Sequence, residues 1–569
     1  MQSTKKTQPT ASEGMLELKK RWSGPEGLLL LLLAAGAAIR FYYSWQPIPV
    51  LLEQGMADDA FYYLNIARNI ARGLGISFDG IWPTNGFHPL YTGLIVPLFR
   101  IFPTSPDLVV RLSLSVLMLF NLLTSLPLYF TVKQVSSPQA GLFAVLLWLF
   151  NPWVLIFSLG GVESSLYIFF VAVSIFLALQ PPGRWFSRTA LLGLCLGLML
   201  LARSDGVFLF SAILFDGFIR PLWSGAPGAF FRNREVIGQA IVLLLVSGLT
   251  FAPWLLWNLV TFGGPIQVSG MAVYWQTHSN ALTTALKVSR LQGSILRTLY
   301  GGLYFSVQTI LIGALLVIVR LVLQKRGPPA LEGDPRNLRE RLGWVLGLYA
   351  FQILAFYGVY LWQQQFWYFM PVLYIAAVLG GIFFGDILKT VGISTLSFRV
   401  FIQAVALLAV LLPGGIIWWN WHTGALQIYP AQRNAIRIAA EISSRTDPNA
   451  RMGSWNSGIL GFLSERTTID LDGVVNNRLY EYVRTRDVSF FDLCGIWDYI
   501  KSTEIDYLTD YEDVWTEEFD HTFQGHLELW SEFPADPTVG SYPIKIYRVL
   551  DNPGALPVAS CPEAIRLLK

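Results

Sequence analysis

Two adjacent carboxylates, Asp58 and Asp59, stand in the stretch GMADDAFYYLNIARNIARG, shortly after the first long apolar segment of the chain. Apolar residues recur from Asp58 at the spacing of one helix face, which predicts an amphipathic helix over residues 58–72 at the membrane surface. The helix dipole favours carboxylates in the first turn, so the pair can simply start this helix. Either carboxylate can also take a proton from a hydroxyl or help to hold a divalent cation.

Other ionisable residues could serve a site at the same face of the membrane. His88 follows the Asn-Gly turn in TNGFHPLY, and Glu163 follows two glycines in SLGGVESSLY. Arg111 begins the next long apolar segment, and Arg203 flanks a tight turn together with Asp205. Each has a simpler structural explanation, as a turn, a helix cap, an interfacial anchor or a local ion pair. Their clustering at one predicted membrane boundary nevertheless favours a functional site.

The composition places these residues in a membrane protein. Of the 569 residues, 53% are hydrophobic and only 14% are charged, whereas a soluble protein has roughly 25% charged residues. Many apolar runs approach the roughly 20 residues that span a bilayer, so the sequence predicts a polytopic α-helical membrane protein. The formal net charge of +3 gives no indication of a nucleic-acid partner.

Positively charged loops determine the predicted orientation. The basic tail, residues 1–22, and the later basic loops fall on one side only if the segment 88–102 does not cross the membrane. We therefore expect a cytoplasmic tail and a membrane domain over residues 23–421, with a large first outside loop at 46–107 that contains a re-entrant helix at 88–102. The count is about 11 spans, expected at residues 25–45, 107–131, 139–158, 163–180, 189–202, 205–220, 236–259, 297–319, 342–362, 366–388 and 400–421.

Residues 422–569 have the composition of a soluble domain. The stretches MGSWNSGILGF, TTIDLDGVV and EIDYLTD have the character of strands and turns, and residues 432–445 have helical periodicity. Because the last span exits outward, this C-terminal α/β domain is expected outside the cytosol. Cys494 and Cys561 could pair there, although two unpaired thiols are an equally good interpretation.

The order of these motifs is similar to that of a known superfamily. DDAFYYLNIARNIARGLGISFDG, TNGFHPLY, GGVESSLY and LMLLARSDG together resemble the GT-C glycosyltransferases, and more narrowly the bacterial arabinofuranosyltransferase-like and protein-mannosyltransferase-like enzymes. NLVTFGGPIQVSG resembles the outside loop that follows their middle spans. The resemblance covers about residues 25–300, and FHPLY lacks the second Pro and the Gly-Lys of the corresponding mannosyltransferase segment.

The resemblance implies a glycosyltransferase that moves a sugar from a polyprenyl-phosphate donor to an acceptor hydroxyl. It implies Asp58 first, or else Asp59, as the base that takes the hydroxyl proton. One base acting on the acceptor, with no covalent intermediate, predicts inversion at the anomeric carbon. No cofactor is certain and no metal ligand is assigned, although the two aspartates could hold a divalent cation. The remaining candidates, for binding the donor phosphate or the sugar, are His88, Arg111, Glu163, Arg203, Arg297, Tyr62 and Tyr63.

Two other classes of protein fit parts of the pattern. A transporter or flippase for a lipid-linked or polar substrate would also be polytopic, but the sequence has no internal repeat and its acids lie at the predicted surface. A membrane scaffold would leave the acidic first loop unexplained. For the enzyme, the acceptor could be a glycan, a lipid or a protein. The expected location is the plasma membrane of a bacterium, with the active face outward.

Overall fold

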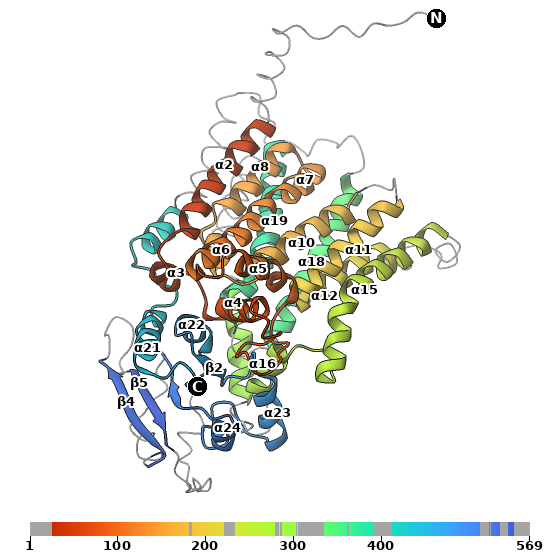
Figure 1. Ribbon diagram of the computed structural model, residues 1–569. Helices are drawn as coiled ribbons and strands as arrows, with labels where there is room; N and C mark the ends of the chain where they lie inside the picture. Colours follow the sequence, from red (N-terminus) through yellow and green to blue (C-terminus); the bar gives the residue numbers. More distant parts are fainter. Residues whose placement is uncertain are drawn as a thin grey trace, which may run out of the picture.

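The structure is a computed structural model. It describes residues 25–180, 185–220, 234–278, 287–302, 335–360, 364–390, 414–511, 525–534 and 544–550, with the single positions 284, 304, 412 and 523. The predicted tail 1–22 and Cys561 lie outside the described residues, as do most of the predicted spans 297–319 and 400–421. A bundle of helices forms the larger part, and a domain with a β-sheet lies at one end of it (Figure 1).

Long apolar helices identify a multi-pass membrane protein. Among the described residues, five helices are long and apolar enough to cross a membrane, and a bent pair makes a sixth span if it is counted as one. The five are α2 (Pro25–Ser44), α6 (Pro106–Leu123) continued by α7 (Ser125–Val135), α15 (Arg234–Phe262), α18 (Pro335–Tyr360) and α19 (Met370–Thr390), the last preceded by the short helix η3 (Phe366–Phe369). The count of about 11 spans stays a prediction.

Shorter helices complete the bundle. The bent pair is α8 (Pro138–Leu149) and α9 (Pro152–Leu159), which meet at 51°. The bend lies at Asn151-Pro152, where proline cannot continue the preceding helix and the Asn151 side chain instead caps α9 by accepting from the Trp153 N–H at 2.9 Å. The others are α10 (Ser164–Ala178), α11 (Trp185–Ala202) and α12 (Val207–Leu214), the last of which lies between η1 (Ser204–Gly206) and η2 (Phe215–Ile219).

The predicted first loop folds into three helices at the end of the bundle that carries the sheet domain. They are α3 (Ile48–Gln54), α4 (Asp58–Ala71) and α5 (Pro89–Ile101) (Figure 1). The amphipathic pattern therefore located α4 to within one residue, and α5 has the short length expected of a re-entrant helix. The environment of α4 differs from the one expected at a membrane surface, because its polar residues Asn65 and Arg68 are buried against the C-terminal domain.

Basic residues gather at the opposite end of the bundle. Lys133 pairs with Glu26 at 3.1 Å, and Lys389 donates to the Ser136 carbonyl at 3.1 Å. Arg341 donates to the Ala178 carbonyl at the end of α10. The loops that the charge pattern assigned to one side of the membrane thus meet one another in space.

The C-terminal domain is built on a five-stranded mixed sheet in the order β2-β1-β3-β5-β4. Its strands are β1 (Arg451–Ser454), β2 (Thr467–Asp470), β3 (Tyr507–Thr509), β4 (Leu527–Phe533) and β5 (Ile544–Val549). The first three pair in parallel, and β5 is antiparallel to both β3 and β4. The helices are α21 (Gln432–Arg445), α22 (Ser457–Leu463), α23 (Asn477–Arg486) and α24 (Trp497–Ser502). Of these, α21 has the bounds that its periodicity predicted.

The two parts meet at the carboxyl edge of the parallel strands. Helix α22 leaves this edge after β1 and packs on α4, while α23 packs on α16 (Val268–His278). The buried side chain of Asn85 ties the parts together, because its Oδ1 accepts from the Val268 N–H at 3.0 Å and from the Asn477 Nδ2 at 2.9 Å. A Cβ on the next residue, Gly86, would lie 2.1 Å from the Val474 carbonyl oxygen, so only glycine permits this approach.

Candidate active site

The two adjacent aspartates have different surroundings. Asp58 is 7% exposed, and its carboxylate accepts the backbone N–H groups of Gly458 at 2.9 Å and Ile459 at 2.8 Å. These N–H groups belong to the first turn of α22, where a helix favours a negative charge. Burial raises the pKa of Asp58 to about 7, although the two N–H groups oppose that change. Asp58 therefore joins α4 to the C-terminal domain.

Asp59 lines a cavity of about 310 Å³ at the junction of the two parts. Its pKa is raised well above the ordinary value, first by burial and then by the nearby charges of Asp58, Asp472 and Glu163. Tyr62 and Tyr63, from the next turn of α4, line the same cavity. The structure thus separates the pair, with Asp59 at the cavity and Asp58 at the interdomain contact. The preference for Asp58 as the base is not supported by this geometry.

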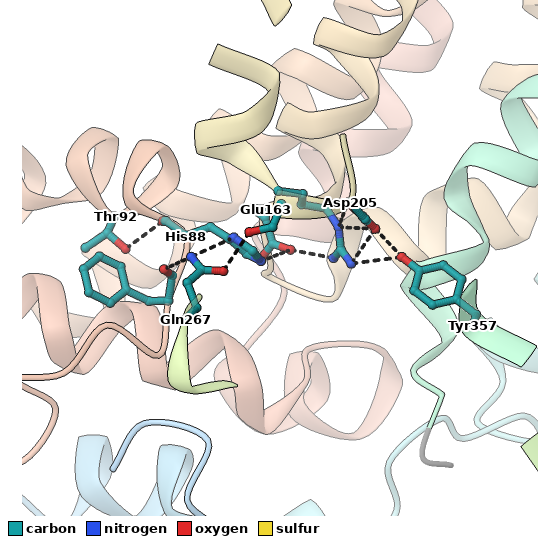
Figure 2. Close-up of polar contacts among 9 residues, drawn as sticks. His88, Thr92, Glu163, Asp205, Gln267 and Tyr357 are labelled. Carbon is teal, nitrogen blue, oxygen red and sulfur yellow. Dashed lines mark hydrogen bonds and ion pairs between the residues drawn. The ribbon is translucent and has the colours of Figure 1, made fainter. Parts of the chain in front are cut away.

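Arg203 pairs with two carboxylates at one wall of the cavity. Figure 2 shows these carboxylates, on Glu163 and Asp205. The Arg203 Nη1 donates to Glu163 at 2.6 Å, and its Nε and Nη2 donate to Asp205 at 3.1 to 3.2 Å. Tyr357 from α18 donates its hydroxyl to Asp205 and is 3.3 Å from the Arg203 Nη2. The local Arg203–Asp205 pair was predicted from sequence, and the link to Glu163 across the bundle adds a second carboxylate. Two carboxylates already neutralise this guanidinium.

His88 lies beside this network. It is the N-cap residue of α5, and its Nε2 is 3.8 Å from the Glu163 Oε1. Its Nδ1 is 3.2 Å from the Gln267 Nε2, and Gln267 in turn accepts from Ser204 (Figure 2). The pKa of His88 is lowered, chiefly by burial. Sequence reasoning found His88. The loop before α16 that contains Gln267, in NLVTFGGPIQVSG, was noted only for its resemblance to the GT-C outside loop, and no residue type or spacing marked Gln267 itself.

The C-terminal domain contributes Asp472, which lies in the strand-like stretch TTIDLDGVV and was not among the predicted site residues. Asp472 follows β2 and lines the cavity together with Val474. Its Oδ1 accepts the Val474 N–H at 2.8 Å, and its backbone carbonyl accepts from Gln276 of α16 at 3.1 Å. Acidic residues that follow parallel strands commonly form sites at the carboxyl edge of a sheet, and that rule was the available signal.

Two of the predicted phosphate-binding arginines do not line the cavity. Arg111 donates its Nη1 to the Trp45 carbonyl at 2.9 Å, near the start of α6. Arg297 is exposed on the helical stretch 287–302. The structure brings together Asp59, Tyr62, Tyr63, His88, Glu163 and Arg203 from the predicted set.

The cavity has an excess of negative charge. Among the described residues, its lining includes four carboxylates, on Asp59, Glu163, Asp205 and Asp472, and one guanidinium, that of Arg203. Among the residues that the structure describes, no three His, Cys, Asp or Glu side chains are grouped so that they could hold a metal ion. The divalent cation stays a prediction.

Comparisons with known proteins cover the two parts differently. Residues 425–547 match a family described as "Domain of unknown function (DUF8728)", which corresponds to the C-terminal sheet domain. A search of curated proteins finds no match.

Solved structures match most of the chain. ArnT from Cupriavidus metallidurans, bound to undecaprenyl phosphate, has a TM-score of 0.56 at 12% identity and covers 92% of this chain and 98% of its own. The oligosaccharyltransferase AglB from Archaeoglobus fulgidus, in complex with an inhibitory peptide and a dolichol-phosphate, has a TM-score of 0.54 at 14% identity and covers 96% and 75%. The arabinofuranosyltransferase AftD from Mycobacteria has a TM-score of 0.50 at 15% identity and covers 92% and 40%.

All three are GT-C glycosyltransferases. The chain therefore has the GT-C fold, as its motifs predicted, with a C-terminal sheet domain attached to the membrane part.

Proposed function

We propose that the protein is a glycosyltransferase that moves a sugar from a polyprenyl-phosphate donor to an acceptor hydroxyl. The observation that carries the proposal is the position of Asp59, which lines a cavity that has residues of the membrane part on one side and of the C-terminal domain on the other. A cavity at this junction can receive a lipid-linked donor from the bilayer and a polar acceptor from water. The GT-C fold and the lipid phosphates bound to ArnT and AglB support this donor class.

In the proposed reaction Asp59 acts as the general base. The acceptor oxygen bonds to the anomeric carbon while the bond from that carbon to the phosphate oxygen breaks, and the hydroxyl proton passes to Asp59. The leaving phosphate is already a stable anion and needs no proton. A single attack on the face opposite the leaving group gives inversion of configuration.

The remaining cavity residues have supporting roles in this proposal. Tyr62 and Tyr63 provide rings on which the sugar can stack, and Glu163 holds Arg203 at the wall. A divalent cation near Asp59 would offset the excess of carboxylates when the phosphate binds. The acceptor is a hydroxyl of a glycan, a lipid or a protein.

The proposed location is the plasma membrane of a bacterium, with the cavity and the C-terminal domain on the outer side. The support is the cluster of basic residues at the far end of the bundle, represented by Lys133, Arg341 and Lys389. Cytoplasmic ends of membrane helices carry such an excess of Lys and Arg.

The experiment uses the purified full chain in lipid with radiolabelled polyprenyl-phosphate mannose, glucose and arabinofuranose. We expect one of these donors to be consumed by the wild type, and the rate to fall about 100-fold or more in Asp59→Asn, since a general base contributes roughly 10²–10⁴-fold. Asp58→Asn should keep more of the rate but lower the melting temperature, because one backbone N–H of α22 loses its acceptor.

Asp107→Asn is the matched control, because Asp107 is exposed in the first turn of α6 and lies outside the cavity lining. Equal rates in the wild type and in Asp59→Asn would refute Asp59 as the base. If the protein moved an intact lipid-linked substrate across the bilayer and transferred no sugar, it would be a transporter and the glycosyltransferase proposal would be wrong.

A further inference from the structure

The side-chain amide of Gln267 makes three contacts that fix its orientation (Figure 2). Its Nε2 donates to the Phe87 carbonyl at 2.6 Å, and its Oε1 accepts from the Ser204 Oγ at 3.0 Å. The same Nε2 is 3.2 Å from the His88 Nδ1. If the amide were turned over, its oxygen would face the Phe87 carbonyl oxygen, and two acceptors would oppose each other. The NH₂ group must therefore face both Phe87 and His88.

This orientation determines where the proton of His88 resides. One hydrogen of the Gln267 NH₂ is used by the Phe87 carbonyl, and the other points to the His88 Nδ1. A ring nitrogen that accepts a hydrogen bond carries a lone pair, so the proton of the neutral imidazole resides on Nε2. The charged ring is disfavoured, because its Nδ1–H would face the amide N–H.

The Nε2–H of His88 has no hydrogen-bond acceptor among the described residues. The nearest carboxylate oxygen, Glu163 Oε1, is 3.8 Å away, which is too long for a hydrogen bond. That oxygen already accepts from the Arg203 Nη1 at 2.6 Å. The charged groups that face the ring are Glu163, Arg203 and Asp205. His88 itself lines the cavity.

We propose that Gln267 is a positioning residue that holds His88 as the neutral tautomer with its proton on Nε2, so that His88 presents an N–H donor to a phosphate oxygen of the lipid-linked donor. The inference rests on the proposed function for the identity of the ligand, whereas the tautomer follows from the contacts alone. His88 keeps its proton throughout the reaction and stabilises the leaving phosphate by a hydrogen bond.

The role suits a cavity whose one guanidinium among the described lining residues, that of Arg203, is already paired with two carboxylates. Arg203 has little capacity left to neutralise a phosphate, and Arg111 lies elsewhere. Burial also lowers the pKa of His88, so burial favours the neutral ring as well. Gln267 determines which nitrogen of that neutral ring carries the proton.

The first readout is nitrogen NMR of the full chain in lipid nanodiscs with ¹⁵N-labelled histidine, with the His88 signals assigned by their loss in His88→Phe. In the wild type we expect Nδ1 without a proton and Nε2 with one. In Gln267→Glu the new carboxylate accepts from Nδ1–H, so Nδ1 should become protonated. In Gln267→Met neither nitrogen is fixed, and we expect a mixture of the two tautomers.

The second readout is the affinity for undecaprenyl phosphate, measured in the same nanodiscs. A hydrogen bond to a charged group is worth about 1.5–3 kcal/mol, so we expect the affinity to fall about tenfold or more in Gln267→Glu and less in Gln267→Met. Gln134→Glu is the matched control, because Gln134 is at the far end of α7, bonded to Phe130 and Gln180, and it should change neither readout.

A wild-type His88 with its proton on Nδ1, or an unchanged His88 spectrum in both Gln267 variants, would overturn the proposal. Unchanged affinity in His88→Phe would overturn its phosphate-binding part. Neither readout needs turnover. A wild type that shows the expected tautomer and binds the lipid phosphate, yet transfers no sugar, would refute the proposed function and leave this inference standing.

Discussion

Helix α4 contributes to two polar regions, the contact with α22 and the cavity. Buried charged groups have different kinds of partner in these two regions. At the contact with α22, Asp58 and Arg68 are bonded to backbone groups, the carboxylate to N–H groups and the guanidinium to the carbonyls of Gly461 and Phe462. In the cavity, Asp59 faces other carboxylates instead. The first arrangement gives both charged groups backbone hydrogen-bond partners, and the second places carboxylates around a cavity that a ligand can enter.

The difference arises between consecutive residues. Successive side chains on a helix are separated by about 100°, since a turn has 3.6 residues. Asp58 is therefore turned to the C-terminal domain when Asp59 is turned to the cavity. The two acids in the first turn of α4 therefore have different roles. Asp58 binds the C-terminal domain, and Asp59 lines the cavity, to which the same domain contributes Asp472.

The largest effect is expected from a side chain that blocks the close approach of α22 to α4. A Cβ on Gly458 would lie 2.3 Å from the Asp58 carbonyl oxygen, which is backbone and cannot turn away. We expect Gly458→Ala to lower stability by about 1–3 kcal/mol, the usual range for overpacking, and to reduce sugar transfer at least tenfold as Asp472 leaves the cavity. Thermal unfolding in detergent and the donor assay measure the two effects.

Gly93→Ala is the control for this change, because a Cβ there meets nothing within 4 Å. It should leave stability unchanged or slightly raise it, since alanine is favoured over glycine within a helix. Full activity and an unchanged melting temperature in Gly458→Ala would show that the domain contact does not depend on this approach.

The cavity can be tested through its pH dependence. A base must be ionised to act, and burial together with its neighbours raises the pKa of Asp59, so kcat/KM should rise with pH above the range in which a free aspartate has already ionised. Asp472→Asn removes one like charge and lowers the pKa of Asp59. The rising limb of the profile should therefore move to lower pH.

Asp498→Asn is the control for Asp472→Asn, because Asp498 is an exposed aspartate on α24. This change should leave the rising limb of the kcat/KM profile at the same pH. A limb that moves to higher pH in Asp472→Asn, or one that does not move, would contradict the coupling between Asp472 and Asp59.

The smallest effect is expected at Arg111, which belongs to neither region. Arg111→Gln removes a hydrogen bond to the Trp45 carbonyl, which is worth about 0.5–1.5 kcal/mol. The transfer rate should change by less than about twofold, because Arg111 does not line the cavity. A twofold change in rate corresponds to a smaller free energy than the loss of one hydrogen bond to a charged group. Steady-state kinetics with the accepted donor measure this rate. A loss of more than tenfold in Arg111→Gln would show that Arg111 takes part in the active site.

Much of the local structure could be predicted because it depends on residues close together in the chain. Periodicity placed α4 and α21. The strand-like stretches contain β2 and β3 and all of β1 except its first residue, Arg451. Within MGSWNSGILGF, the chain turns from β1 into α22, and the N–H groups of Gly458 and Ile459 hold an anion there, the carboxylate of Asp58.

The amino-acid sequence by itself determined the membrane class, the acidic helix start at Asp58 and Asp59, and the motifs that resemble GT-C enzymes, because hydropathy, helix periodicity and turn chemistry are local properties. Only the tertiary structure decided which aspartate reaches the cavity, that Asp472 and Gln267 lie beside it, and that Arg111 does not. Those outcomes depend on contacts between segments up to about 400 residues apart, such as Asp58 with Gly458, and no local pattern encodes them.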